Sequence, residues 1–322
     1  MHMKRIFNLL AVLLAVAIGV NASETRETYI FNITEEGDTL RLDRYPSQIA
    51  SPTGKGQSLI FVFGGGFRNG QRDNGYYVPM FEFLARNGIN VFSIDYRLAL
   101  KNVGLDDVRT GVEFRDRMLN AINIAVEDLF AATTFIVNHS EEWGIDPDAI
   151  VTSGSSAGAI TSLHAEYYIC NDMVPAGALP EGFNYAGVVP LAGAICSAEP
   201  LHWNTVPSPM LMFQGDADSV VPFDKDGIIE GIGGMWGSKA ISESLDACGA
   251  PYRFHVVHGS GHEIAAFPMV DNKGEILDFM YALKVGNGCR SVSSFETVPG
   301  RDEHDARYST DIYRRSIFPK LK

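Results

Sequence analysis

Short apolar runs and longer segments with helical periodicity alternate along most of the chain. The apolar runs are rich in β-branched and aromatic residues and predict strands at Ser58–Phe63, Ile89–Ile94, Ala149–Thr152, Ala186–Leu191, Met210–Phe213 and Tyr252–Val257. The segments with helical periodicity are Tyr77–Arg86, Val126–Trp143, Ala157–Cys170, Ser238–Cys248 and Lys273–Lys284. Because continuous apolar strands that alternate with helices form parallel sheets covered on both faces, the pattern predicts an α/β fold with a mostly parallel central sheet and helices on both faces.

Some segments depart from this alternation. Tyr29–Ile33 and Thr39–Tyr45 alternate apolar and polar residues, which predicts an antiparallel hairpin at the sheet edge with Glu35–Asp38 as its turn. Three stretches match neither period: Ala99–Asn120, Asn171–Tyr185 and Phe223–Gly237. Since long insertions at strand ends usually shape the pocket of such folds, we expect these stretches to shape the pocket of this one.

The first residues have the pattern of a targeting signal. Lys4 and Arg5 precede an apolar run at Leu9–Val20, and the run is followed by Asn21 and Ala22. Small residues at positions 20 and 22 suit signal peptidase, so we expect residues 1–22 to be removed by cleavage before Ser23. A membrane anchor is the alternative, but the run is shorter than the ~20 residues that a spanning helix needs. The mature protein is therefore expected to be exported, either periplasmic or secreted.

No internal repeat and no Pro- or Ser-rich linker divides the rest of the chain. We therefore expect one catalytic domain over residues 23–288 and a polar tail over residues 289–322 that packs on it. The chain has 26 basic and 39 acidic residues and a net charge of -13, which argues against nucleic acid or anionic lipid as the main partner. Nothing in the sequence indicates the oligomeric state.

Export permits disulfides, and the four cysteines allow three pairings that sequence alone cannot separate. Cys248 ends one predicted helix and Cys289 follows the next, so both are expected near the same edge of the sheet, and we favour that pairing. Cys170 and Cys196 are then expected to be unpaired. No C-x-x-C or H-x-x-x-H spacing is present around the cysteines, which makes a zinc site improbable.

The window Ala149–Ala159 carries the strongest chemical signal. It reads as a buried strand, then Gly-Ser-Ser-Ala-Gly from Gly154 to Gly158, then an apolar helix. Glycines two positions either side of Ser156 allow a sharp strand-to-helix turn that exposes the hydroxyl. The alternative is an ordinary glycine-rich turn, but the strand before and the helix after favour a nucleophile elbow.

A serine nucleophile needs a base, and the base needs an orienting carboxylate. Two aspartates follow the predicted strand Met210–Phe213, and we favour Asp218 because it lies further beyond the strand end than Asp216. Asp216 is the alternative; its other interpretation is a loop aspartate that bonds local backbone N–H groups.

We expect the base to be His262, which lies on a glycine-flanked loop after the last predicted strand. His258 and His255 lie at or inside that strand and are interpreted as packed, hydrogen-bonded core histidines. Three other histidines do not lie on such a loop and are interpreted as structural or surface residues: His139, His164 and His202. The order serine, aspartate, histidine is that of α/β-hydrolases.

The tetrahedral intermediate of acyl transfer also needs hydrogen-bond donors. The strand that includes Phe61–Phe63 ends in three glycines, and the backbone of Gly65 and Gly66 together with the amide of Ala157 is the predicted oxyanion hole. A phosphate-binding loop is the alternative, but no G-x-G-x-x-G or Gly-Lys-Ser/Thr follows. Three aromatic residues flank the predicted site and are possible pocket residues that stack on sugar or phenolic rings: Phe67, Trp203 and Trp236.

These motifs resemble those of α/β-hydrolases of the esterase/lipase superfamily, near the hormone-sensitive-lipase-like and xylan/feruloyl esterase branches. Ser93–Leu98 resembles their D-Y-R-L segment, and Glu127–Ala132 with Trp143–Asp148 resembles the helix and turn before the elbow. The resemblance covers about residues 55–285. It departs at Phe63, where the family usually has His, at Ser155, where relatives often have Asp, and at Ala159, where they often have Gly.

The resemblance and the predicted triad imply a serine carboxylesterase that acts through an acyl-enzyme and requires neither a metal nor an organic cofactor. An exported, acidic esterase suits a small-molecule or polysaccharide ester, such as acetyl or feruloyl groups on plant polysaccharide. The alternatives are a lipase or general carboxylesterase, a prolyl-type serine peptidase, and a binding protein on an inactive hydrolase scaffold.

Overall fold

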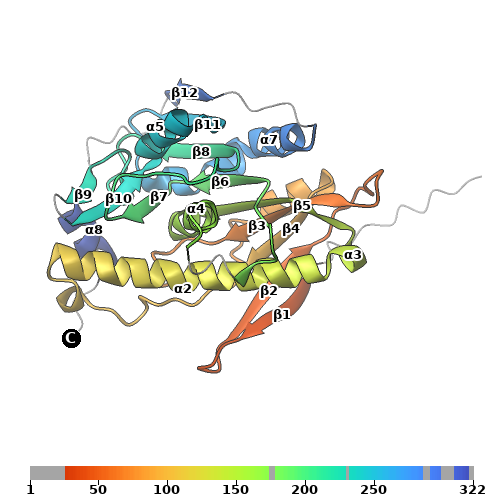
Figure 1. Ribbon diagram of the computed structural model, residues 1–322, viewed down its shortest axis with the longest axis horizontal. Helices are drawn as coiled ribbons and strands as arrows, with labels where there is room; N and C mark the ends of the chain where they lie inside the picture. The colour runs from red at the N-terminus through yellow and green to blue at the C-terminus, as the bar shows by residue number, and fades with distance from the viewer. Residues whose placement is uncertain (1–25, 174–177, 230–231, 286–290, 299–307, 319–322) are drawn as a thin grey trace, which may run out of the picture.

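A sheet of nine strands, counted over the described residues, forms the centre of the molecule (Figure 1). The computed structural model describes residues 26–173, 178–229, 232–285, 291–298 and 308–318, so the predicted signal peptide lies outside the described residues. In spatial order the strands are β1 (Glu27–Ile33), β2 (Thr39–Tyr45), β4 (Asn90–Ile94), β3 (Gly56–Val62), β5 (Ile145–Ser155), β6 (Gly187–Leu191), β8 (Met210–Gly215), β11 (Tyr252–Val257) and β12 (Val292–Glu296). The pairs β1–β2 and β2–β4 are antiparallel and the other pairs are parallel.

Helices cover the parallel part of the sheet. They are α1 (Val78–Arg86), α2 (Gly111–Asn138), α3 (Ser140–Trp143), α4 (Ala157–Cys170), α5 (Ser238–Cys248), α6 (Pro268–Asp271), α7 (Lys273–Val285) and α8 (Thr310–Ile317), with short 3₁₀ helices η1 (Leu105–Asp107) and η3 (His262–Ala265). Helix α2 packs on α4, while α1 packs on α6 and α7. Every residue of β3, β4, β6 and β8 is buried, which is the pattern of strands covered on both faces. The predicted α/β fold with a mostly parallel sheet is confirmed.

Helix α2 begins well before the predicted start at Val126. The Thr110 hydroxyl accepts from the Glu113 amide at 3.1 Å, and the Glu113 carboxylate accepts from the Thr110 amide at 2.8 Å. This capping box starts the helix at Gly111, inside a stretch that the sequence pattern had left without a helix. By length and composition α2 could cross a membrane, but 56% of its most apolar window is buried in the protein, as in a core helix.

The glycine-rich stretch Phe223–Gly237 also contains regular secondary structure. It contains β9 (Gly227–Ile229) and β10 (Gly233–Gly237). Strand β10 lies between β9 and β7 (Ala194–Ser197) and pairs with both in an antiparallel three-stranded sheet. A Cβ at Gly234 would lie 2.0 Å from the Gly227 carbonyl oxygen, so the close strand contact requires glycine there.

The polar tail contributes to the fold in two places. Strand β12 extends the sheet beside β11, and α8 lies at the N-terminal end of α2 (Figure 1). Tyr313 packs edge-on against Phe114 of α2 at 5.4 Å between ring centroids, and Phe318 is only 1% exposed. The end of the chain therefore buries aromatic side chains although its composition is polar.

Candidate active site

Ser156 lies at a strained turn between β5 and α4. Its φ of 52° is in the left-handed region, and its amide donates to the Leu191 carbonyl of β6 at 2.9 Å. The two flanking glycines permit this turn, because a Cβ at Gly154 would lie 2.3 Å from the Gly158 carbonyl and a Cβ at Gly158 would lie 1.9 Å from the Val62 carbonyl oxygen. Strand, turn and helix thus have the local geometry of a nucleophile elbow.

The structure brings the three predicted triad residues together. His262 Nε2 lies 2.8 Å from Ser156 Oγ, and His262 Nδ1 lies 2.8 Å from Asp218 Oδ2. Asp218 follows β8, and His262 is the first residue of η3 after β11. Three loops at the carboxyl ends of parallel strands therefore supply the nucleophile, the base and the acid.

The Asp218 carboxylate is buried and surrounded by donors. Its Oδ1 accepts from the amides of Val220 and Val221 at 2.8 and 2.9 Å. Gln214 Nε2 lies 3.3 Å from Oδ2, and the Gln214 amide oxygen accepts from Ser238 Oγ at 2.8 Å. This network holds the carboxylate in the orientation that reaches the His262 ring.

The alternative acid, Asp216, pairs with a different histidine. Its Oδ2 lies 2.7 Å from His258 Nδ1, and its Oδ1 accepts from the Gly259 amide at 2.7 Å. The structure therefore places Asp216 outside the Ser156 hydrogen-bond chain. His258 is not a packed core histidine as the sequence had suggested, because its side chain is 65% exposed.

The other histidines have structural surroundings. His255 is half-buried against Phe213 and hydrogen-bonded to Glu296. His164 is fully buried, with Nδ1 2.7 Å from the Ile160 carbonyl oxygen and Nε2 accepting from the Cys196 amide at 3.0 Å. Burial lowers the pKa of His164 to about 4. His139 stacks on Trp143 and His202 is exposed.

The predicted oxyanion loop lies beside the nucleophile. Gly65 and Gly66 have φ values of 131° and 63°, and both line the same pocket as Ser156. A Cβ at Gly65 would lie 2.0 Å from the Asn69 carbonyl oxygen, so the turn requires glycine. Ala157 is the first residue of α4, where backbone N–H groups have no intrahelical acceptor. Gly65 and Gly66 therefore line the same pocket as Ser156, and Ala157 follows Ser156 directly, while the assignment of their amides as the oxyanion hole stays a prediction.

Two departures from the family pattern have structural roles here. Phe63 packs on Tyr96 at 4.5 Å between centroids, and the Tyr96 hydroxyl donates to the Phe63 carbonyl at 3.0 Å. The Ser155 hydroxyl donates to the Ala265 carbonyl at 2.7 Å. Aromatic packing therefore braces the glycine loop, and Ser155 ties the elbow to η3, the helix that begins with His262.

The pocket at Ser156 has a volume of about 550 Å³. The pocket is also lined by residues that the sequence analysis did not single out: Arg68, Asn69, Asn74, Tyr77, Val220, Ala265 and Ala266. Arg68, Asn69 and Val220 lie within three residues of the glycine loop or Asp218, and adjacency to those motifs was the available signal for them. Burial raises the pKa of Tyr77, while hydrogen bonds from the Gly64 backbone and the Ser155 side chain act in the opposite direction.

The three predicted aromatic pocket residues do not line this pocket. Phe67 is fully buried and packs edge-on against Tyr96. Trp203 donates to Ser244 Oγ at 3.1 Å, and Trp236 donates to the Ser197 carbonyl at 3.3 Å within the three-stranded sheet. The prediction was wrong because nearness to a motif in sequence does not decide which way an aromatic ring points after folding.

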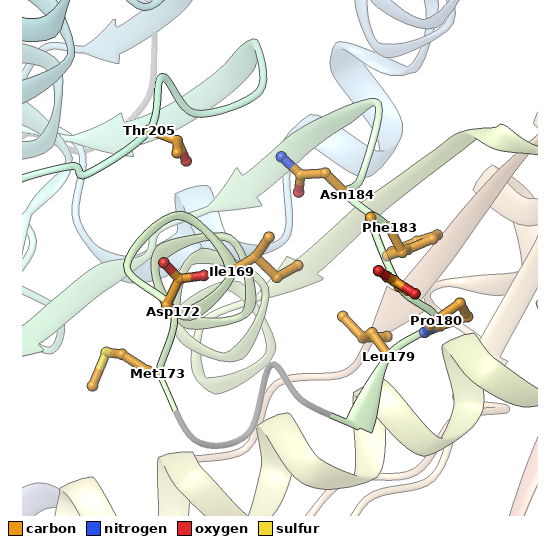
Figure 2. A pocket seen from close by; sticks show the side chains of 10 residues that line it. Ile169, Asp172, Met173, Leu179, Pro180, Phe183, Asn184 and Thr205 are labelled. Atoms are coloured by element: carbon orange, nitrogen blue, oxygen red, sulfur yellow. The ribbon is translucent and has the colours of Figure 1, made fainter.

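The described residues of the three insertions do not line the active pocket either. Asn171–Tyr185 instead contributes to a separate pocket of about 660 Å³ at the C-terminal end of α4 (Figure 2). Figure 2 shows Ile169, Asp172, Phe183 and Asn184 around this space. Because α4 has 14 residues and rises ~1.5 Å per residue, this pocket lies about 20 Å from the helix end that carries Ser156.

Within the described ranges, no group of three or more His, Cys, Asp or Glu side chains is arranged to hold a metal ion. Among the cysteines that the structure describes, Cys170, Cys196 and Cys248 form no disulfide. Cys289 lies outside the described residues, so its pairing with Cys248 stays a prediction.

Comparison with known proteins agrees with this geometry. The family model BD-FAE matches residues 46–168, which include the glycine loop and the elbow. No curated protein matches the sequence. Among solved structures, the apo form of Thermogutta terrifontis esterase 2 is similar, with 20% identity, a TM-score of 0.58, and coverage of 83% of this chain and 97% of that one.

Two further structures of that planctomycete esterase are also similar. The butyrate-bound form is 21% identical with a TM-score of 0.59, covering 81% of this chain and 94% of that one. The form phosphorylated by paraoxon is 19% identical with a TM-score of 0.58 and the same coverage. The strand order, the family match over residues 46–168 and the Ser156–His262–Asp218 arrangement agree, and the chain has the α/β-hydrolase fold of these structures.

Proposed function

We propose that this esterase removes acetyl or feruloyl groups from plant polysaccharide through an acyl-enzyme on Ser156. The observation that carries the proposal is the unbroken hydrogen-bond chain from Ser156 Oγ through the His262 ring to Asp218, at 2.8 Å for each contact. A serine hydroxyl in this position is activated by proton transfer to the imidazole as it attacks a carbonyl.

The residues of the site divide the steps of this mechanism among them. Ser156 Oγ attacks the ester carbonyl while His262 Nε2 accepts its proton, and Asp218 orients the ring through Nδ1. The amides of Gly65, Gly66 and Ala157 stabilise the developing oxyanion. His262 then protonates the leaving alcohol. A water molecule hydrolyses the acyl-enzyme by the same steps in reverse and regenerates Ser156.

The lining of the pocket supports a polar substrate. Arg68, Asn69, Asn74 and Tyr77 bring hydrogen-bonding groups to one segment of the wall, and Val220 adds an apolar contact. The volume of about 550 Å³ falls in the usual range of roughly 300–1,000 Å³ for small-molecule sites, which accommodates an acetyl or a feruloyl group. Sugar hydroxyls next to the ester would find partners among the amide and hydroxyl side chains.

A Ser156→Ala variant tests the mechanism. We expect hydrolysis of p-nitrophenyl acetate to fall to the rate in buffer alone, because the nucleophile is missing. Ser153→Ala is the matched control, since Ser153 lies on the same strand and donates to the Val189 carbonyl at 2.8 Å, outside the pocket. A Ser156→Ala protein with wild-type activity would falsify the mechanism.

The substrate class needs a separate experiment. Initial rates on acetylated xylan, methyl ferulate and a long-chain acyl ester, measured side by side, should be highest on one of the first two. A preference for the long acyl chain would contradict the carbohydrate proposal and favour a lipase. Cleavage of proline-containing dipeptide anilides would favour a peptidase instead.

We also propose that the protein acts after export, with residues 1–22 as a cleaved signal peptide. The basic start, the apolar run and the small residues before Ser23 support this. N-terminal sequencing of the protein from the periplasm and the medium of its host should begin at Ser23. Full-length protein retained in the cytoplasm would contradict the proposal.

A further inference from the structure

Tyr77 brings a phenol group to the wall of the active pocket. It directly precedes α1 and lines the pocket together with Ser156 and the glycine loop. Its half-buried ring packs against Phe61 of β3, at 4.9 Å between ring centroids, and against Phe81 of α1, at 6.3 Å. Two aromatic side chains of the fold therefore fix the direction in which the hydroxyl points.

The hydrogen bonds of this hydroxyl join it to residues of the same pocket. Its two partners are the Gly64 backbone and the Ser155 side chain, and both residues line the pocket themselves. Ser155 directly precedes the nucleophile, and a Cβ on Gly64 would lie 3.3 Å from Ser156 Cβ. The polar end of Tyr77, and not only its ring, thus lies against the backbone that carries Ser156 and the glycine loop.

The proton of this hydroxyl has only a weak acceptor in the protein. Gly64 contributes its N–H, and the Ser155 hydroxyl donates its own proton to the Ala265 carbonyl at 2.7 Å. Within the described residues, the Tyr77 proton is therefore left with the neutral Ser155 oxygen, and no carbonyl or carboxylate accepts it. Burial raises the pKa of Tyr77 against the opposing effect of its hydrogen bonds, so the hydroxyl keeps its proton at neutral pH.

From these contacts we infer that Tyr77 is a further catalytic residue, whose O–H donates to the carbonyl oxygen of the ester as that oxygen becomes negatively charged. The inference rests on the proposed esterase function and deepens it by adding a side-chain donor to the predicted oxyanion hole. The charged oxygen is a stronger acceptor than the Ser155 hydroxyl and takes over the hydrogen bond. No proton leaves Tyr77 in this step, because the proton of Ser156 moves to His262.

The side of the nucleophile on which Tyr77 lies selects the carbonyl oxygen over the leaving oxygen. Tyr77 contacts Gly64, which directly precedes the predicted oxyanion residues Gly65 and Gly66. The leaving alcohol must instead lie next to His262 Nε2, which protonates it. A donor on the side of the glycine loop therefore acts on the oxyanion.

Tyr77→Phe removes the O–H and keeps the ring. We expect kcat for p-nitrophenyl acetate to fall about 10²-fold with little change in KM, because the lost contact strengthens only in the transition state. Tyr76→Phe is the matched control: it makes the same change at the neighbouring residue, whose side chain is exposed and does not line the pocket. It should keep the kcat of the wild type. An unchanged kcat in Tyr77→Phe would overturn the inference.

A pair of ketone inhibitors separates a contact to the oxyanion from general damage to the pocket. A phenylalkyl trifluoromethyl ketone forms a tetrahedral adduct with Ser156 whose oxygen is negatively charged, whereas the methyl ketone with the same phenylalkyl chain binds without reacting. In Tyr77→Phe, the inhibition constant of the trifluoromethyl ketone should rise by about the factor by which kcat/KM falls, and that of the methyl ketone should not change. An equal rise for both ketones would show a merely structural role and overturn the inference, as would no rise for either.

The wild-type adduct covers the case in which Tyr77→Phe does not fold. In a crystal structure of the protein with the trifluoromethyl ketone bound to Ser156, the Tyr77 oxygen should lie about 2.7–3.1 Å from the adduct oxygen. A separation beyond roughly 4 Å would overturn the inference. Failure of the proposed function is seen separately, as the absence of Ser156-dependent hydrolysis in the wild-type protein.

Discussion

Two aspartate–histidine pairs lie side by side at the ends of β8 and β11, and only one of them reaches the nucleophile. Asp216 and His258 are 2.7 Å apart, and Asp218 and His262 are 2.8 Å apart. The distances are equivalent, but the side chains of the first pair are 27% and 65% exposed, against 0% and 24% in the second. A short contact between the two residue types therefore does not identify a triad; burial of the acid and the reach of the base do.

The register of the two strands explains the difference. Gly215 of β8 pairs with Val257 of β11, so Asp216 and His258 both follow the last paired position of their strands. Asp218 and His262 lie beyond that edge, where the Ala217 amide donates to the Ser260 carbonyl at 3.0 Å. A Cβ at Gly215 would lie 2.1 Å from the Ser260 carbonyl oxygen, so glycine is needed for this close approach of the two loops.

The largest difference between the two pairs is expected when His262 and His258 are each replaced by alanine. His262→Ala should lower kcat about 10⁶-fold, the order of loss seen when a triad base is removed, because Ser156 then has no proton acceptor. His258→Ala should keep a rate close to that of the wild type. Hydrolysis of p-nitrophenyl acetate measures both, and a large loss in His258→Ala would mean that the exposed pair takes part in the reaction.

The next largest difference in kcat is expected between variants of the two aspartates. Asp218→Asn should lower kcat about 10⁴-fold, because an amide in place of Oδ2 no longer selects the His262 tautomer that accepts from Ser156. Asp216→Asn should have a small effect, since its partner His258 lies outside the chain to Ser156. If the two variants lost equal activity, the assignment of Asp218 as the orienting acid would be wrong.

A buried histidine away from the triad, His164, links the stability of the fold to pH. Burial lowers the pKa of His164 to about 4 in the folded protein, from the ordinary histidine value of 6.5. Between these values the unfolded chain binds more protons, so the free energy of unfolding falls as pH drops from 6.5 to 4, and above 6.5 this contribution is constant. Urea unfolding across this range should show a fall about 3 kcal/mol larger in the wild type than in His164→Gln. Parallel curves for the two proteins would contradict the prediction.

The smallest expected effect concerns the support behind Asp218. Ser238→Ala removes the hydroxyl that donates to Gln214, which in turn contacts Asp218, and should cost about 1 kcal/mol, or roughly fivefold in kcat. Ser242→Ala is the control, because Ser242 is a buried serine of the same helix whose hydroxyl donates to the Lys239 carbonyl. An equal effect of both variants on kcat would indicate a general change in α5 rather than an effect on Asp218.

Local patterns predicted the parts of the molecule that depend on neighbouring residues. The elbow at Ser156 is such a part, because Gly154 and Gly158 act on the same turn and their need for glycine follows from the backbone around them. The start of α2 also depends on neighbouring residues, although the hydrophobic pattern did not predict it. Thr110 and Glu113 have the spacing of a capping box, and the signal was present in the sequence but the charged residues of the first turns obscured the helical period.

The pocket wall depends on contacts between distant segments and could not be predicted in this way. Trp203 and Trp236 are aromatic and close in sequence to regions that follow strand ends, yet each donates its indole N–H to a partner away from the pocket. The surroundings of Arg68 depend on the opposite end of the chain, because Phe318 packs on its guanidinium. The two tryptophan contacts join residues 41 and 39 positions apart, and Phe318 is far from Arg68 in the sequence, so no local periodicity predicts these contacts.

The sequence by itself determined the strand and helix alternation, the nucleophile elbow and the set of residue types from which a triad can be built. These follow from local sterics and from burial of apolar strands, which act over a few residues. The tertiary structure decided that Asp218 and not Asp216 reaches the base, that Tyr77 and Arg68 line the pocket while the tryptophans do not, and that a polar tail buries Phe318. The physical reason is that strand register and helix packing determine where the side chains of distant segments meet, and these are properties of the whole fold.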